Sequence, residues 1–356
     1  MKKILGALAL SATLMVPVSA SAALQQLTDL FVFGDSLSDG GNSGLLSAAY
    51  PAENPSGIVF PPSPYFNGQY SNGPVAVDYL WQAYNPGDTR FKPSLAGGTN
   101  YALGGSTSGR ENFNSISSSV PASLQPAFAQ KSNAWQVQSF LSSTPVFDPT
   151  TSLFVVWLFP NDVFNWLQTG QTPGTVAGGP PVAADPATLI ANGLTNVAST
   201  VAALAGQGAQ RFLIPNLPDL GSIPGAGPLG NPALTTLSTA YNTELALLLA
   251  ALDNLLPATE IIGYDTFGLL NRIRNDPTAY GFEVADRSCV ANLASGVCNP
   301  GNWDKWLFWD DVHPTTAAHR LLGEQFAATV PEPATLMLLA VALFGAALSG
   351  KRKSRE

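Results

Sequence analysis

Short apolar runs alternate along the chain with longer amphipathic segments. Four runs are nearly continuous in apolar residues, at 30–33, 153–158, 211–214 and 260–264. Such runs are typical of strands buried on both faces of a parallel sheet. A shorter extended piece at 99–101 is a candidate for one more strand. The pattern therefore predicts a mostly parallel, five-stranded sheet.

Spaced apolar residues between these runs predict helices at 74–84, 185–204, 231–256 and 315–329. Pro74 suits the first helical position, and Thr315 is a plausible cap for the last helix. This alternation of strands and helices predicts a three-layer α/β/α domain. The stretches 40–73, 86–98, 106–132 and 168–185 are rich in Gly, Pro, Ser and Asn, and we expect them to be loops that line or cover a substrate cleft.

Both ends of the chain are typical of processing segments. Residues 1–22 have a basic start, an apolar stretch and the small-residue site Ala20-Ser21-Ala22, which favours a signal peptide over a first core helix. At the other end, Val330-Pro331-Glu332-Pro333 precedes an apolar run of membrane-spanning length and a basic cluster expected to stay cytoplasmic. The expected organisation is a signal peptide at 1–22, one domain at 23–329 and a terminal segment with a transmembrane helix at 330–356.

The charge pattern argues against nucleic-acid binding. The chain has a formal net charge of −8, and its basic clusters lie only at the two ends. Its two cysteines, Cys289 and Cys298, are close together in a loop with no histidine nearby, which makes a poor zinc site. Because export permits disulfides, we expect these cysteines to be bonded to each other. Nothing in the sequence indicates a metal or an organic cofactor.

Ser36 follows the first predicted strand, in Phe33-Gly34-Asp35-Ser36-Leu37-Ser38-Asp39. Ligands bind at the carboxyl ends of strands in open α/β sheets, so this serine is either a nucleophile or an ordinary turn residue. A nucleophilic serine needs a neighbouring base. The chain has two histidines, and His313 follows Asp310 by three residues, a spacing at which a carboxylate can orient the ring. His319 is expected to be an ordinary surface or helix residue.

These motifs together resemble the GDSL (SGNH) hydrolase family. The Ser36 heptapeptide is similar to the first block of that family, and Asp310-x-x-His313-Pro314-Thr315 is similar to its last block. Asn100-Tyr101-Ala102-Leu103-Gly104-Gly105-Ser106 resembles the second block and Asn161-Asp162 the third, while Ser71-Asn72-Gly73-Pro74 resembles the lipase-like branch. The resemblance implies a flavodoxin-like SGNH hydrolase fold and a serine esterase or lipase.

The resemblance also implies roles for individual residues. Ser36 would be the nucleophile, His313 its base and Asp310 the residue that orients the base. Backbone N–H groups of Ser36 and Gly105 and the side chain of Asn161 would form the oxyanion hole.

Two features keep alternatives open. The third block is usually Gly-x-Asn-Asp, but here Phe159 and Pro160 precede Asn161, which puts the position of the amide in question. Asp311 competes with Asp310 for the orienting role. Asp35, Asp39 and Asp162 are expected to be turn and cap residues rather than catalysts.

The C-terminal segment resembles a PEP-CTERM sorting signal. This resemblance implies a Gram-negative bacterium, transient anchoring in the inner membrane, cleavage by an exosortase-type enzyme, and a final place in the periplasm, at the cell surface or outside the cell. The substrate expected for the domain is an ester, either a lipid or short-chain ester or an acetyl group on a polysaccharide. The rival interpretation is an inactive surface or matrix binding protein that retains the fold.

Overall fold

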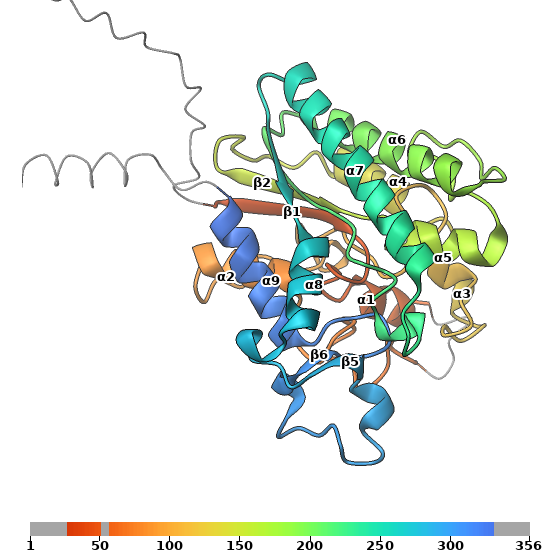
Figure 1. Ribbon diagram of the computed structural model, residues 1–356. Helices are drawn as coiled ribbons and strands as arrows, with labels where there is room; N and C mark the ends of the chain where they lie inside the picture. The colour runs from red at the N-terminus through yellow and green to blue at the C-terminus, as the bar shows by residue number, and fades with distance from the viewer. Residues whose placement is uncertain (1–26, 51–56, 331–356) are drawn as a thin grey trace, which may run out of the picture. The chain divides into compact units, whose positions relative to one another are not determined.

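The computed structural model describes residues 27–50 and 57–330 (Figure 1). The predicted signal peptide and the predicted transmembrane helix lie outside these residues. The described part forms one compact unit of the chain.

A parallel sheet of four strands lies at its centre, in the order β1 (Asp29–Gly34), β2 (Ser152–Trp157), β3 (Arg211–Pro215) and β4 (Glu260–Tyr264). These are the four apolar runs that the sequence indicated. Phe31 lies opposite Phe154, and Phe154 lies opposite Phe212. Side chains of one face therefore stack across neighbouring strands.

The prediction of a fifth strand at 99–101 is wrong. This segment meets β1 only in an isolated bridge between Val32 and Asn100. The Asn42 side chain donates to the carbonyl oxygens of Asn100 and Ala102, each at 2.8 Å. The groups that face β1 are those of Thr99 and Tyr101, which bond to Val32. The Gly34 N–H, which the next rung of a parallel ladder would use, donates instead to Gln136 Oε1 at 2.9 Å, so the segment leaves the sheet edge after one bridge.

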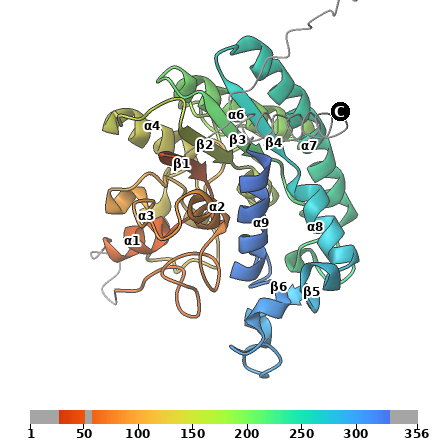
Figure 2. The same ribbon diagram turned by 90° about the vertical axis from the view of Figure 1, so that its left-hand side faces the viewer.

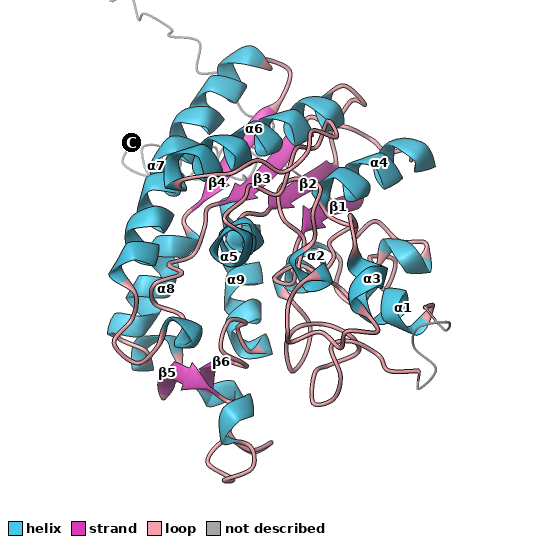
Figure 3. Cartoon of the chain, turned by 90° about the vertical axis from the view of Figure 1, so that its right-hand side faces the viewer, coloured by secondary structure: helices cyan, strands magenta, loops and turns pink. Residues whose placement is uncertain are grey.

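Successive residues of β1 point to opposite faces, and each face is covered by its own helices. Phe31 and Phe33 pack in a core with α4 (Asn133–Ser143), α6 (Pro186–Ala205) and α7 (Pro232–Leu255). Leu30 and Val32 pack in a second core with α2 (Ala76–Tyr84) and α9 (Thr316–Thr329). Figure 3 shows α6 and α4 on one side of the strands with α2 and α9 on the other. The predicted three-layer α/β/α class is confirmed.

The long predicted helices form, and polar side chains define where they begin. Asp185 accepts a hydrogen bond from the Thr188 N–H at the start of α6. Asn231 accepts hydrogen bonds at the start of α7, and Thr315 accepts one from the Ala318 N–H at the start of α9. These caps satisfy N–H groups that have no partner inside the helix. Shorter helices also lie in the predicted loops, namely α1 (Asn42–Ala48) and α3 (Gln125–Phe128), and α5 (Pro160–Thr169) follows β2.

A second, smaller sheet lies apart from the first (Figure 2). Its parallel strands are β5 (Val284–Ser288) and β6 (Trp306–Phe308), and α8 (Thr266–Asn275) precedes them in the chain. Leu269 and Ile273 of α8 share an apolar cluster with Leu307 of β6 and Ala318 of α9. This cluster attaches the small sheet to the last helix of the domain.

Candidate active site

Ser36 lies in a tight turn directly after β1. The Asp35 carboxylate accepts a hydrogen bond from the Leu37 N–H at 2.9 Å, which closes the turn. Gln136 of α4 holds the end of the strand, since it accepts from the Gly34 N–H at 2.9 Å and donates to the Gly34 oxygen at 2.8 Å. The backbone before Ser36 is thus fixed by a buried side chain from another helix.

The buried carboxylate of Asp39 organises the chain after this turn. It accepts hydrogen bonds from the backbone N–H groups of Gly41, Asn42, Ser43 and Gly104 and from the Ser43 hydroxyl. The first three of these groups lie at the start of α1, and Gly104 lies in the loop that resembles the second family block. Asp39 therefore joins the nucleophile loop to the loop that carries Gly105.

His313 lies in a second loop, between β6 and α9. The Trp309 N–H donates to the His313 oxygen at 2.7 Å, which closes the loop. One oxygen of Asp310, Oδ1, accepts the N–H groups of Val312 and His313 at 2.8 and 2.6 Å. The backbone thereby places the carboxylate beside the imidazole ring.

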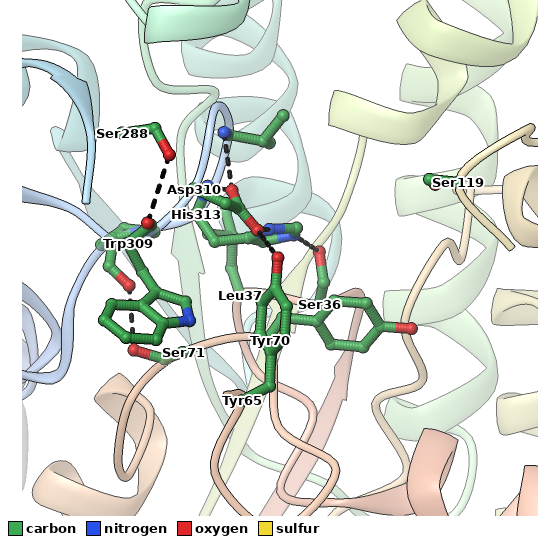
Figure 4. A network of polar contacts seen from close by, with 12 residues as sticks. Ser36, Leu37, Tyr65, Tyr70, Ser71, Ser119, Ser288, Trp309, Asp310 and His313 are labelled. Atoms are coloured by element: carbon green, nitrogen blue, oxygen red, sulfur yellow. Dashed lines mark hydrogen bonds and ion pairs between the residues drawn. The ribbon is translucent and has the colours of Figure 1, made fainter. Parts of the chain in front are cut away.

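The two loops meet at the predicted residues (Figure 4). His313 Nε2 lies 2.7 Å from Ser36 Oγ, and His313 Nδ1 lies 2.7 Å from Asp310 Oδ2. Burial alone would raise the pKa of Asp310, but the charge and hydrogen bonds of His313 and the Tyr65 hydroxyl outweigh it and lower that pKa. Asp310, rather than the exposed Asp311, makes the contact with the ring.

Residues from the 65–72 segment hold the His313 loop from outside. The Tyr65 hydroxyl donates to Asp310 Oδ2 at 2.7 Å. Ser71 donates to the Pro314 oxygen at 2.9 Å, and Asn72 accepts from the Thr316 N–H at 2.8 Å. Tyr70 packs its ring 5.1 Å from the His313 ring. Sequence reasoning missed Tyr65 and Tyr70, and the only available signal was the Ser71-Asn72 motif beside them.

The predicted oxyanion donors line one pocket with Ser36 and His313. Gly105 has a φ of 74°, and a Cβ there would come within 2.5 Å of Asn112 and Asn114. Glycine is therefore required at this position. The Asn161 amide donates to the Ser106 oxygen at 3.1 Å and also hydrogen-bonds the Asp35 carboxyl, which lies next to Ser36.

Phe159 replaces the usual glycine without entering the pocket. Its φ of 110° lies in the left-handed region, which is unfavourable for a side chain. The ring is fully buried and stacks on Tyr241 with centroids 3.8 Å apart. A Cβ on Gly193 would come within 2.3 Å of this ring, so the glycine of α6 leaves the space that the ring occupies. Pro160 then begins α5, where a missing N–H costs nothing.

The other acidic residues of the motifs serve as turn and hydrogen-bond acceptors. Asp162 accepts from the Ser108 N–H and hydroxyl at 2.7 and 2.5 Å. Burial raises the pKa of Asp35 to about 7, although the hydrogen bond from the Leu37 N–H acts to lower it. Burial also raises the pKa of Asp162 to about 7, although the hydrogen bonds from Ser108 act to lower it. Two buried carboxyl groups, one directly before Ser36 and one directly after Asn161, thus resist ionisation.

His319 is not a surface residue, which corrects one part of the prediction. It lies in α9 as expected, but its side chain is fully buried. Its Nδ1 accepts a hydrogen bond from the Ala76 N–H at 3.2 Å, which joins α9 to α2. Burial and then the charge of His313 lower its pKa to about 3. It is a neutral core residue.

A cavity of about 180 Å³ extends from Ser36 and His313. Two of the predicted cleft loops reach it, through Phe60, Tyr70 and Phe113. Its remaining wall comes from segments that sequence reasoning assigned to no site, namely 218–223, α8, β6 and α9. Within residues 27–50 and 57–330, no group of three His, Cys, Asp or Glu side chains could hold a metal ion.

The two cysteines lie beside the His313 loop. A disulfide joins Cys289 and Cys298, whose Cα atoms are 5.3 Å apart. Both cysteines are buried against Trp306 and Trp309, the residues at the start of β6 and directly after it. The Cys289 N–H donates to the Phe308 oxygen at 3.2 Å. The bridged loop therefore packs on the segment that leads to Asp310.

Comparison with known proteins gives three results. The family model of the GDSL-like lipase/acylhydrolases matches residues 30–326, and that of the PEP-CTERM protein-sorting motif matches residues 329–353. One GDSL esterase/lipase of Arabidopsis thaliana is 27% identical over 332 residues, covering 86% of this chain and 89% of that protein. A second from the same plant is 29% identical over 321 residues, covering 83% and 82%. A solved mutant of an acetyl-xylooligosaccharide esterase from Geobacillus is 14% identical, with a TM-score of 0.40 over 86% of this chain and 96% of that chain.

Proposed function

Because the chain belongs to the GDSL-like lipase/acylhydrolase family and is an ester hydrolase, we propose that Ser36, His313 and Asp310 form its catalytic triad. The observation that carries this proposal is the unbroken line of two 2.7 Å contacts from Asp310 Oδ2 through the imidazole to Ser36 Oγ. A nucleophilic serine requires this arrangement, in which a base touches the hydroxyl and a third group orients the base.

The reaction then proceeds in two halves. His313 Nε2 takes the proton of Ser36 as Oγ bonds to the ester carbon, and the carbonyl oxygen becomes an oxyanion. When the tetrahedral intermediate collapses, the bond to the leaving oxygen breaks and His313 returns the proton to the departing alcohol. A water molecule, deprotonated by His313, next attacks the acyl-enzyme, and the acid leaves as Ser36 regains its proton.

The oxyanion would be stabilised by three N–H donors, from the backbone of Ser36 and Gly105 and the side chain of Asn161. Each is a fixed donor at the pocket wall, and such a donor is worth about 3 kcal/mol in the transition state. The Phe159-Pro160 sequence is compatible with this role, because Phe159 points into the core while Asn161 remains in the pocket wall.

Point variants of the full chain test the triad against p-nitrophenyl esters. Ser36→Ala should lower kcat by about 10⁴-fold or more, and Asp310→Ala by about 10³-fold or more. Asp311→Ala is the matched control for Asp310, because its side chain is exposed one residue away. Equal losses in the two aspartate variants, or full activity in Ser36→Ala, would refute the assignment.

A fluorophosphonate probe gives a second readout that does not depend on the choice of ester. Such a probe attaches covalently to an activated serine, and peptide mass mapping identifies the modified residue. We expect labelling of Ser36 in the unaltered chain and its loss in His313→Ala.

We further propose that the enzyme is exported and sorted. The PEP-CTERM motif at 329–353 supports this, together with the basic start and small-residue site of residues 1–22. Cleavage after Ala22 and near Pro331-Glu332-Pro333, by an exosortase-type enzyme, would release a domain of residues 23–330 beyond the inner membrane. Intact mass of the protein from its native host tests this, since a surface fraction still carrying 334–356 would refute the second cleavage.

A further inference from the structure

The cavity at Ser36 has walls of two different kinds. Part of its lining is polar and includes Asn114, Ser119 and Asn161. Another part is aliphatic, with Leu269 and Ile273 from α8 and Ala318 and Leu322 from α9. We call the part of the cavity between α8 and α9 the aliphatic arm.

The spacing of these residues shows that the arm is a continuous apolar surface. Leu269 and Ile273 are one helical turn apart on α8, as are Ala318 and Leu322 on α9, so each pair lies on one side of its helix. Leu307 of β6 lines the same cavity and belongs to the same apolar cluster. Leu and Ile side chains offer no hydrogen-bond partner to a sugar hydroxyl, and burying an unpaired hydroxyl there would be unfavourable.

We propose that the aliphatic arm binds an unbranched hydrocarbon chain of the ester, so that the substrate class is a medium-chain ester and not an acetylated polysaccharide. The volume of the whole cavity, about 180 Å³, sets an upper limit on the length of that chain. An apolar cavity of about 150 Å³ admits one benzene molecule, so this cavity has room for about six carbons. This inference rests on the proposed role of Ser36, because the arm is part of the cavity that Ser36 lines.

Two series of esters test the inference and show which side of the ester bond occupies the arm. In the first, p-nitrophenyl esters keep one leaving group while the acyl chain grows from acetate to decanoate. In the second, alkyl acetates keep the acyl group while the alcohol grows. We expect kcat/KM to rise about threefold to fourfold per methylene in one series until about six carbons, which is the rate equivalent of burying each CH₂.

Variants on opposite walls of the arm make the test specific. Ala318→Leu adds three carbons to the wall. In whichever series shows the rise, it should lower the ratio of kcat/KM for the six-carbon member to that for the shortest member about tenfold. Ile273→Ala widens the arm from α8 and should move the optimum to longer chains by about two carbons. Leu247→Ala, at an exposed position of α7 away from the cavity, is the matched control and should leave the ratio of kcat/KM values unchanged.

The outcomes separate this inference from the triad proposal. Failure of the triad would appear as activity in Ser36→Ala, whatever the chain length. With Ser36 essential, a flat or falling profile in both series would overturn the inference, as would ratios unchanged in both wall variants. A rise in either series that Ala318→Leu removes would support it. Thermal melting of each variant identifies any that fail to fold. If Ala318→Leu fails to fold, Ile273→Ala still tests the inference.

A second inference comes from an independent contact, at the far end of the triad. The Tyr65 hydroxyl donates to Asp310 Oδ2, the same oxygen that contacts His313 Nδ1, while Oδ1 accepts two backbone N–H groups. Both oxygens of the carboxylate are thus fully occupied. We propose that Tyr65 is a positioning residue that fixes Asp310 and moderates the negative charge it presents to the imidazole.

Tyr65→Phe tests this role, because it removes one hydroxyl and keeps the ring. With that hydrogen bond gone, Oδ2 presents more charge to His313 and stabilises the imidazolium more strongly. The acid limb of the kcat/KM–pH profile should therefore move to higher pH by about half a unit, and kcat should fall about threefold to tenfold. A purely structural role for Tyr65 would lower activity without moving the limb.

Tyr79→Phe is the matched control, since it also removes a hydroxyl that bonds to a distant residue, Thr316, 237 positions later, but this hydroxyl does not touch the triad. Its pH profile should match that of the unaltered enzyme. An unmoved acid limb in Tyr65→Phe would overturn the inference, and so would an equal movement in Tyr79→Phe.

Discussion

The nucleophile and its base reach the same contact from two differently built regions. Ser36 follows a strand of the central sheet, and its surroundings are held by the buried side chains of Asp39, Asn42 and Gln136. His313 follows a strand of the small two-stranded sheet, and its loop is held by a disulfide-bridged neighbour and by residues about 240 positions earlier in the chain. The Ser36 region is part of the central core, whereas the His313 region packs against that core from the small sheet.

This difference predicts different consequences when each region is disturbed. Damage around Ser36 should unfold the whole domain, because its contacts are those of the central sheet. Damage around His313 should first open a local segment, since local stability follows the density of buried contacts. Activity would then fall before global stability does.

The largest expected effect is that of Asp39→Ala, which breaks the nucleophile region. The substitution leaves four buried donors without an acceptor, since the Gly104 N–H still has Ser43 Oγ, and each such group costs about 1–3 kcal/mol. Allowing for relaxation, we expect a loss of about 4 kcal/mol or more in the free energy of unfolding. Urea denaturation measures it, with Asp148→Ala as control, because Asp148 also accepts N–H and hydroxyl bonds but is exposed. A loss below about 1 kcal/mol would contradict the assigned role.

Next in size is the loss of the disulfide, which acts on the base region. Replacing Cys289 and Cys298 by Ser should cost about 2.5 kcal/mol by the chain-entropy estimate for a nine-residue separation. Hydrogen exchange locates the effect. We expect faster exchange in residues 284–313 and unchanged exchange in β1. Equal acceleration in both would show that the two regions unfold as one and that the contrast between them is not real.

The pH dependence of stability tests the contact between α9 and α2, which His319 makes. The folded pKa of His319 is about 3, below its ordinary value of 6.5, so the unfolded chain takes up a proton first as pH falls. The stability that neutral His319 contributes is therefore present above pH 6.5 and is lost as pH falls through the window toward 3. Between pH 6.5 and 5, this loss should be about 2 kcal/mol.

His319→Asn isolates this contribution, because an amide oxygen can accept the Ala76 N–H without titrating. Asp35 and Asp162 act in the opposite direction, since their raised pKa values favour the folded state in acid and that advantage is lost as pH rises toward 7. Both aspartates are present in the unaltered protein and in His319→Asn, so their contributions cancel when one stability–pH curve is subtracted from the other. Parallel stability–pH curves for the two proteins would contradict a buried, neutral His319.

The same contrast explains what the sequence could and could not reveal. The strands and long helices were predictable because apolar periodicity and capping residues act locally, as at Thr315. Ser36, His313 and Asp310 were recognisable because each loop carries its own motif. The 99–101 strand failed because a distant side chain, Gln136, takes the Gly34 N–H that a longer ladder would use. Tyr65 and the aliphatic arm depend on residues brought together across the chain, and leucines such as Leu269 have the pattern of ordinary core.

The smallest expected effect is a difference of about 1 kcal/mol between two variants of Phe159, at the edge of the nucleophile region, where two contributions oppose each other. Its positive φ costs about 1–3 kcal/mol, whereas the buried ring stacked on Tyr241 stabilises the fold by about 3–5 kcal/mol relative to a small side chain. Phe159→Gly removes both, so we expect a net loss of about 2 kcal/mol with kcat within about twofold, because Asn161 is held by α5. Phe159→Ala removes the ring but keeps a Cβ at positive φ, so it should be less stable than the glycine variant by about 1 kcal/mol. Chemical denaturation of the three proteins measures both differences. An alanine variant as stable as the glycine variant would show that the backbone at 159 is not strained, and a glycine variant more stable than the unaltered protein would show that strain outweighs packing.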